Sequence, residues 1–254
     1  MSARAYPLIQ ALLMAGLGLF LAEKLWSGAV FYYINERFLL LIAFGAAAAL
    51  ALAAGAAWRW WRPAAAHAPD HDHDHDHDHA PARFPIWTVA LVALPLALGL
   101  AVPARPLGAS ALASKGLNAS GGALLSVSGG AAVQLEIAPE QRTVLDWVRA
   151  FNYAEDPAIY TDQPADVIGF VYRTADLRPD QFMVSRFIVT CCAADASGVA
   201  MLVDWPQAAA LAENTWVRVR GPVRAAALNG QPLPLIAAVT VEPAEQPEHP
   251  YMYP

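Results

Sequence analysis

Three long apolar segments occupy most of the first 102 residues of the chain. They run from Tyr6 to Ala22, from Phe38 to Trp60 and from Phe84 to Val102. A helix that crosses a bilayer needs roughly 17 to 25 predominantly apolar residues. Each segment has this length, and Pro95 inside the third is tolerated in a membrane helix. We therefore expect three N-terminal transmembrane helices, which makes the lipid bilayer a partner of the chain.

The first segment has an alternative interpretation as a cleaved signal peptide, because Arg4 precedes its apolar run. The run ends in Ala22, Glu23 and Lys24, which lack the small-residue pattern of a cleavage site. We therefore expect an uncleaved membrane anchor.

The orientation of the helices follows from positive charges, which are more frequent in cytoplasmic loops. Four Lys or Arg residues would lie near the helix ends on each side, so their number does not decide the orientation. The segment Trp58–Arg62 combines three tryptophans with two arginines and is interpreted as cytoplasmic. This predicts a multi-pass membrane protein with an extracytoplasmic C-terminal domain.

The remainder of the chain has the composition of an acidic soluble domain. Residues 103–254 carry ten Lys and Arg against fifteen Asp and Glu, whereas residues 1–102 carry six against seven. Nucleic-acid binding depends on a net basic surface, so we expect no nucleic-acid partner. Two cysteines in 254 residues also exclude a disulfide scaffold.

Changes in composition divide the chain into five parts. We expect transmembrane helices 1 and 2 in residues 1–62, a His/Asp-rich linker in 63–83, helix 3 in 84–102, a Gly/Ala/Ser linker in 103–138 and a β domain in 139–254. The β domain should begin with a short helix, Pro139–Asn152. Five strands are expected after it: Val167–Thr174, Phe182–Cys192, Val199–Trp205, Trp216–Arg224 and Leu235–Glu242. Five short strands separated by Gly, Pro, Asn and Asp are typical of an OB-like barrel, and an open sandwich is the alternative.

A run of alternating His and Asp follows the second apolar segment. Imidazole and carboxylate together are ligands for zinc, nickel or copper. Because a flexible loop loses entropy when it orders around an ion, we expect modest and poorly selective binding. The alternative is a polar low-complexity linker. The candidate ligands are His67, His71, His73, His75, His77, His79, Asp72, Asp74, Asp76 and Asp78.

The two cysteines are adjacent, at Cys191 and Cys192, and Asp195 follows them. Neighbouring residues of a strand point to opposite faces, so one ion cannot take both thiolates unless the chain turns there. Thiolates bind soft metals, and Asp195 would add an oxygen ligand. The alternatives are small apolar core residues or redox-active thiols, although a C-x-x-C motif is absent.

Other polar and aromatic residues of the domain carry weaker indications. Arg186 is expected in an ion pair or at a partner contact, and Tyr251 and Tyr253 in the Pro-rich ending are weak partner-binding candidates. In the fourth expected strand, Val and Arg alternate, so Val217 and Val219 should point inward. The arginine stripe Arg218, Arg220 and Arg224 is then expected to be a solvated strand face. Because the sequence contains no Gly-rich phosphate loop and no Ser-His-Asp set, we expect no catalytic residues and no enzymatic activity.

Five motifs resemble those of a known family. They are the segments 106–116 (PLGASALASKG), 169–173 (GFVYR), 180–195 (DQFMVSRFIVTCCAAD), 215–221 (TWVRVRG) and 245–254 (EQPEHPYMYP). With them, the whole chain resembles the YcgQ-type family of bacterial permease subunits. The resemblance implies a membrane accessory subunit that works with a multi-span permease of the YcgR/YraQ type and is linked to metal handling. Related permeases include exporters of organic arsenicals, and Cys191, Cys192 and Asp195 are the matching motif positions.

These observations predict a non-catalytic accessory subunit of a permease complex that handles a transition metal, with zinc the leading candidate, or a metalloid. Three helices with few charges inside the membrane cannot by themselves form a polar ion path, so transport requires a partner. One alternative is a membrane-tethered thiol/disulfide-active protein that uses Cys191 and Cys192. Another is a purely structural scaffold.

Overall fold

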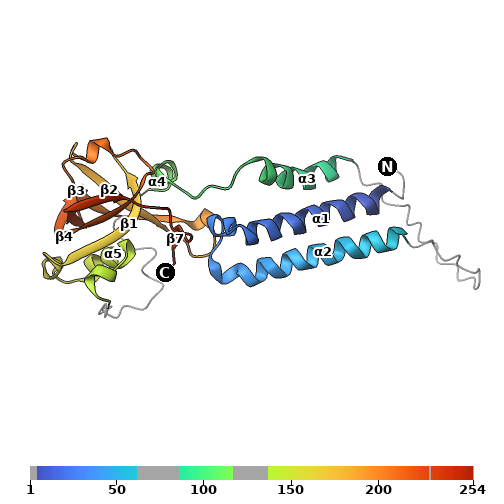
Figure 1. Ribbon diagram of the computed structural model, residues 1–254, viewed down its shortest axis with the longest axis horizontal. Helices are drawn as coiled ribbons and strands as arrows, with labels where there is room; N and C mark the ends of the chain where they lie inside the picture. Colours follow the sequence, from blue (N-terminus) through green and yellow to red (C-terminus); the bar gives the residue numbers. More distant parts are fainter. Residues whose placement is uncertain (1–4, 62–85, 117–136, 229, 254) are drawn as a thin grey trace, which may run out of the picture. The chain divides into compact units, whose positions relative to one another are not determined.

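The computed structural model describes residues 5–61, 86–116, 137–228 and 230–253. The chain divides into two compact units (Figure 1). One contains residues 1–30 and 36–104, and the other contains residues 31–35 and 105–254. The predicted ligands of the His/Asp run, residues 67–79, lie outside the described residues.

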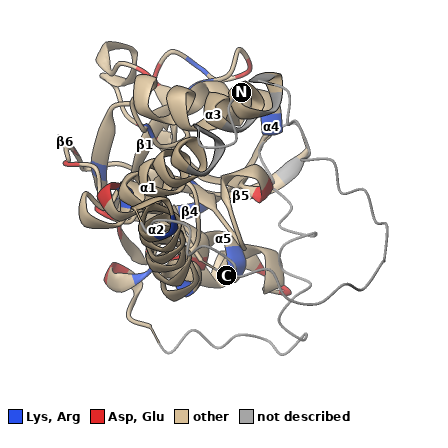
Figure 2. Cartoon of the chain, turned by 90° about the vertical axis from the view of Figure 1, so that its right-hand side faces the viewer, with Lys and Arg blue, Asp and Glu red and all other residues tan. Residues whose placement is uncertain are grey.

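The first unit is helical and consists of α1 (Ala5–Trp26), α2 (Leu39–Trp61) and α3 (Ile86–Ala101). Two stretches, Leu8–Trp26 and Glu36–Trp61, are long and apolar enough to cross a membrane. In an 18-residue window of each stretch, only 11% and 17% of the residues are buried. A core helix of a soluble protein would be mostly buried, so these exposed apolar faces indicate membrane association. The ribbons of the three helices are mostly tan in Figure 2, because charged residues are rare along them.

The third predicted span coincides with α3, which contains 16 residues. At a rise of 1.5 Å per residue, such a helix is about 24 Å long, somewhat less than the roughly 30 Å hydrocarbon core of a bilayer. Two spanning helices therefore follow from length and composition, whereas the third remains a prediction.

Small residues line the contact between α1 and α2. The residues of α2 that are buried are Ala46, Ala49, Ala53 and Ala56. A Cβ atom added to Gly18 of α1 would lie 2.6 Å from Leu50 Cγ, so the two helices approach closely at this glycine. Close approach at small residues is typical of helix packing in membranes.

The second unit is a mixed α/β domain around one sheet. Its helices are α4 (Ala109–Lys115) and α5 (Val144–Tyr153). Its strands are β1 (Pro164–Tyr172), β2 (Gln181–Ile188), β3 (Ser197–Asp204), β4 (Trp216–Leu228), β5 (Gln231–Ala237), β6 (Thr240–Pro243) and β7 (Tyr251–Met252).

The strand pairings form a cycle. β1 pairs with β2, β2 with β3 and β5 with β4, all antiparallel, while β3 pairs parallel with β5. β1 also pairs with β4 along seven residues of each strand, which closes the cycle. β6 adds to β4, and β7 adds parallel to β2.

The core lies between α5 and the strands. Trp147 of α5 is fully buried together with Phe182, Met201 and Ile236 from three strands. The helix begins where Thr143 and Asp146 form a reciprocal capping box. The predicted helix over 139–152 therefore starts later, at Val144, and Pro139–Gln141 forms a separate 3₁₀ turn.

The alternation predicted for β4 is confirmed, and three other predictions need correction. Val217 and Val219 are fully buried, whereas the arginines between and beside them are not. The expected linker 103–138 contains α4, and the fifth predicted strand is divided into β5 and β6, because the Ala238 amide bonds to Asp204 and the Val239 amide to Arg220. The second predicted strand ends at Ile188 rather than at Cys192.

Candidate metal centre

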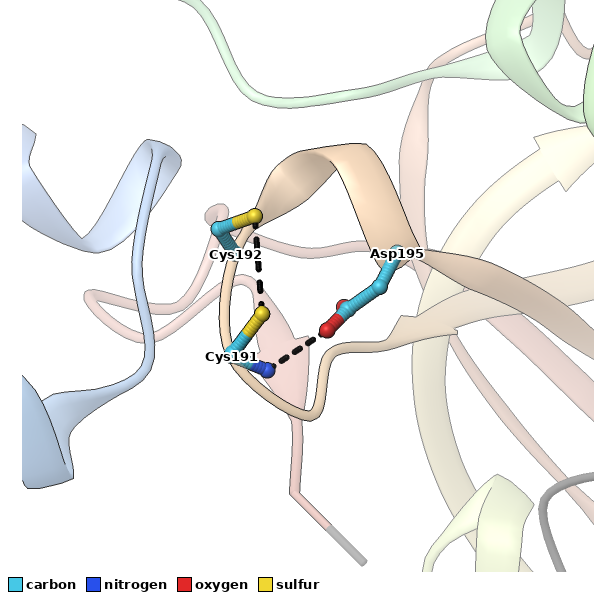
Figure 3. Close-up of side chains that lie close together, drawn as sticks. All are labelled: Cys191, Cys192 and Asp195. Carbon is cyan, nitrogen blue, oxygen red and sulfur yellow. Dashed lines mark hydrogen bonds between the residues drawn. The ribbon is translucent and has the colours of Figure 1, made fainter.

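Cys191, Cys192 and Asp195 lie together in the connection between β2 and β3 (Figure 3). One possible ligand atom from each residue, two sulfurs and a carboxylate oxygen, lies within 4.8 Å of the others. Cys191 is exposed and Cys192 is half-buried, so an ion can reach both sulfurs from solvent.

The sulfurs meet because the cysteines follow the strand instead of belonging to it. β2 ends at Ile188, and a 3₁₀ turn begins at Ala193, so the pair lies in a bend. The Sγ atoms of Cys191 and Cys192 are 3.6 Å apart and point toward one another in Figure 3. The predicted strand that included both cysteines was therefore wrong, and the turn that a shared ion requires is present.

The carboxylate of Asp195 holds this bend in shape. It accepts hydrogen bonds from the backbone amides of Cys191, at 2.7 Å, and Thr190, at 3.1 Å. Burial would raise the pKa of the Asp195 carboxyl, but hydrogen bonds from Cys191 and Thr190 outweigh it and leave that pKa below its ordinary value. Asp195 is therefore a carboxylate at neutral pH.

The two thiols differ in acidity. The neighbouring Asp195 carboxylate, and then the Cys192 sulfur, raise the pKa of the Cys191 thiol to about 11. The backbone amide of Ala194, followed by the thiol of Cys191, lowers the pKa of Cys192 below its ordinary value. The pair therefore favours a thiolate at Cys192 that accepts a hydrogen bond from the thiol of Cys191.

The donor set fits a soft or borderline metal ion. Two sulfurs at about 2.3 Å from a tetrahedral zinc ion lie about 3.8 Å apart, whereas a linear arrangement with the same bonds would need about 4.6 Å. The observed separation of 3.6 Å is close to the tetrahedral value. Cys191, Cys192 and Asp195 would fill three positions and leave the fourth open, as in sites that exchange a ligand.

A second segment, Phe31–Asn35, supports the bend from outside the β domain's own sequence. Asn35 is fully buried, and its backbone amide donates to the Cys191 carbonyl at 3.1 Å. The amide of Ala193 donates to the Tyr33 carbonyl at 2.8 Å. Sequence reasoning missed this segment, and the only signal was a polar asparagine between two apolar runs.

Arg186, a predicted partner-binding residue, instead forms hydrogen bonds inside the β domain. The Arg186 guanidinium is largely buried and donates to the carbonyls of Ile168, His249 and Pro250. In the part of the chain that the structure describes, these carbonyls replace the expected carboxylate partner. Burial lowers the pKa of Arg186 to about 10.

Tyr251 is buried, and its hydroxyl donates to the Tyr32 carbonyl and accepts from the Leu107 amide. Tyr253 is half-buried two residues further on. The C-terminal segment therefore packs against β2, with which β7 pairs. A partner contact by these tyrosines remains a prediction.

The arginine stripe of β4 is engaged in ion pairs at the surface. Arg218 and Arg220 both contact Asp166, and Arg220 also contacts Glu242. The hydrogen bond from Arg218 is the main cause that lowers the pKa of Asp166. This arrangement agrees with the expected solvated strand face.

Comparisons with known sequences cover most of the chain. The DUF1980 N-terminal domain family matches residues 9–118, and the DUF1980 C-terminal domain family matches residues 140–254. The UPF0703 protein YcgQ of Bacillus subtilis (strain 168) is 26% identical to the chain over 107 residues. These residues are 41% of the chain and 36% of that protein, so the alignment spans about a third of the relative's length.

Proposed function

The chain belongs to the YcgQ-type family, and from this premise we propose that it is a non-catalytic membrane accessory subunit of a permease complex that handles a transition-metal ion such as zinc or a metalloid. The observation that carries the proposal is the exposed cluster of Cys191, Cys192 and Asp195. Its open fourth position suits an ion that is received and passed on, because a structural zinc site has four protein ligands.

The need for a permease partner follows from the composition of the helices. α1 contains one acidic and one basic residue near its end, α2 contains one arginine near its end and α3 contains none. An ion path through a membrane requires polar or ionisable groups that line it. We therefore assign the path to a multi-span partner, and to this chain the handling of the ion at the membrane surface.

Chain connectivity supports three membrane crossings. Residues 31–35, which connect α1 to α2, belong to the same compact unit as the β domain. We infer that both lie on one side of the membrane. α2 leads the chain to the other side, and an odd number of crossings between Trp61 and Arg105 must bring it back. α3 is the segment that can make this crossing, and residues 62–85 with the His/Asp run then lie on the opposite side. The Trp58–Arg62 cluster favours a cytoplasmic location for that side, and the β domain is then extracytoplasmic.

The strand pairings support an OB-like barrel for the β domain. The cycle β1-β2-β3-β5-β4, with β4 returning to β1, is the order expected when a five-stranded Greek-key sheet closes. In this proposal, the closed sheet supplies a rigid base from which the β2–β3 connection presents its cysteines.

A second candidate function is thiol/disulfide exchange. It is favoured by the 3.6 Å separation of the sulfurs and by the unequal acidities of the two thiols. The two functions predict different behaviour of the thiols. In the metal-handling protein, zinc protects the thiols from alkylation, and a chelator that removes the zinc makes them reactive again. In the exchange protein, they react with a disulfide substrate whether or not zinc is present.

A zinc titration of the full-length protein in detergent tests the proposal. The parent for this experiment has Ser in place of every His from His67 to His79, so that the loop no longer binds zinc. We expect one zinc ion per chain, and loss of this ion in the Cys191→Ser/Cys192→Ser variant with an unchanged circular dichroism spectrum. Thr190→Ser, which retains the backbone amide bonded to Asp195, is the matched control. Equal zinc binding by the double variant would contradict the proposal.

A further inference from the structure

The backbone of the candidate centre is built from two places in the sequence. Phe31–Asn35, between α1 and α2, contacts Val189–Ala193, between β2 and β3. The two segments lie more than 150 residues apart in the chain and belong to one compact unit.

Asn35 donates the hydrogen bonds that run from residues 31–35 to the bend between β2 and β3. Its side-chain amide donates to the carbonyls of Thr190, at 3.0 Å, and Val189, at 3.4 Å, and its backbone amide donates to the Cys191 carbonyl. Asn35 is fully buried, so these bonds are shielded from water. Loss of either partner would leave a buried polar group unsatisfied, which is unfavourable.

The backbone of Cys192 and Ala193 also contacts the segment 31–35. Cys192 forms an isolated antiparallel bridge with Ile34, and the next amide, that of Ala193, donates to the Tyr33 carbonyl. Each ligand cysteine is therefore flanked by backbone hydrogen bonds to residues 33–35. A change in the backbone of the bend when an ion binds would therefore act on these bonds as well.

The segment is also close in sequence to both long helices. A 3₁₀ turn, Ala29–Tyr32, follows α1 after two residues, and another, Glu36–Phe38, leads directly into α2. Only residues 33–35 lie between the two turns, so we expect a displacement of this short segment to be passed along the backbone to the helix ends.

We propose that residues 31–35 couple occupancy of the Cys191–Cys192–Asp195 centre to the ends of α1 and α2, so that ion binding changes the membrane part of the subunit. The inference rests on the proposed function, because a metal ion is its ligand. Coupling is reciprocal: if the ion orders residues 31–35, then weakening their contact with the bend must lower the affinity for the ion.

Hydrogen exchange of the full-length protein in detergent, with and without zinc chloride, measures the first half of this relation. The His-to-Ser parent described above is used, so that zinc acts only at the cysteine centre. We expect the amides of Asn35 and Ala193 to exchange at least about 5-fold more slowly when zinc is bound, the lower end of ordinary coupling. The Cys191→Ser/Cys192→Ser variant should show no such change.

Ala193→Pro tests the second half, because it removes one hydrogen bond between the bend and Tyr33. Ala193 is the first residue of a 3₁₀ turn, and Cys192 before it is extended, with φ −155° and ψ 167°, the backbone that a following proline requires. We expect the zinc dissociation constant to rise at least about 5-fold. Lys115→Ala is the matched control, since Lys115 donates to Ala194 of the same bend from α4, and it should leave the protection of residues 31–35 by zinc unchanged.

The outcomes separate the two proposals. Zinc binding without any change in exchange at residues 31–35, or unaltered affinity in a folded Ala193→Pro protein, overturns the coupling and leaves the metal centre standing. Absence of zinc binding in the parent overturns both. If Ala193→Pro does not fold, Asn35→Asp decides, because it keeps the side-chain shape but removes the donor to Thr190 and Val189 and should weaken zinc binding likewise.

Discussion

At the scale of single residues, the bend between β2 and β3 is controlled by its hydrogen bonds. Asp195 satisfies two amides, Asn35 satisfies the facing carbonyls, and the cysteines are left with their side chains on one side. The spacing of the cysteines could not predict this arrangement, because the apolar residues that precede them fit a continued strand as well as a bend. Asn35 was beyond prediction from the sequence, since its partners are 154 and 155 residues away.

The unequal thiols give a first prediction at this scale. Because the thiolate is the reactive form, iodoacetamide at pH 8 should label Cys192 before Cys191 in the metal-free protein. Cys191, with a pKa of about 11, should become comparably reactive only as the pH approaches that value. Peptide mass spectrometry after brief labelling measures both sites. Preferential labelling of Cys191 at pH 8 would refute the assignment, and the Cys192→Ser variant controls for accessibility.

Asp195→Asn gives a second prediction. The amide keeps one acceptor oxygen for the bend but removes the charge that a metal cation favours. We expect zinc affinity to fall about 10- to 100-fold, as for altered metal surroundings, in the His-to-Ser parent. Isothermal titration calorimetry of the detergent-solubilised protein measures it, with Asp156→Asn, at the cap of a distant 3₁₀ turn, as the control. Unchanged affinity would exclude Asp195 as a ligand.

At the scale of the elements, the sequence patterns identified most helices and strands but not all of their ends. Alternating Val and Arg predicted β4, and apolar length predicted α1 and α2. The apolar run after β2 does not continue the strand. The Val189 amide donates to the Met252 carbonyl, and the next two amides, of Thr190 and Cys191, donate to the Asp195 carboxylate. β7 has only two residues and depends on its pairing with β2, so no local pattern indicates it.

The contact between α1 and α2 gives a third prediction. Gly18→Val would force the helices apart at Leu50, because the added Cβ would lie 2.6 Å from the Leu50 side chain and 3.1 Å from the Ala46 carbonyl oxygen. We expect overpacking to destabilise this unit by about 1–3 kcal/mol. Gly45→Val is the control with the same change in helix propensity, because a Cβ added there would meet no described atom beyond its own stretch of helix within 4 Å. Thermal unfolding in detergent should show a lower midpoint for Gly18→Val alone.

At the scale of the whole molecule, the resemblance to the YcgQ-type family was evident from the motifs and is confirmed. The family alone does not reveal that the segment between α1 and α2 supports the bend of Cys191 and Cys192. That link depends on tertiary contacts of residues 31–35, and it makes the topology of the helices relevant to the function.

The proposed topology with three crossings gives a fourth prediction. Cysteines introduced at Ser27 and Ser114, in a protein whose native cysteines are serines, should both react with a membrane-impermeant maleimide on intact cells. A cysteine at Ala64 should react only after permeabilisation, because it precedes α3 on the opposite side. Labelling of position 64 together with the other two on intact cells would exclude a single crossing by α3.

The proposed role of this chain is that of a metal-handling subunit of a permease complex. Its most direct test is affinity purification of the unaltered protein in mild detergent, with mass spectrometry of the co-purifying proteins and metal analysis of the same sample, in parallel with the Cys191→Ser/Cys192→Ser variant. We predict that a multi-span permease accompanies both proteins and that the variant carries less zinc or other soft metal. A protein that purifies without a permease, and whose metal content is unaffected by the loss of both cysteines, would contradict the claim.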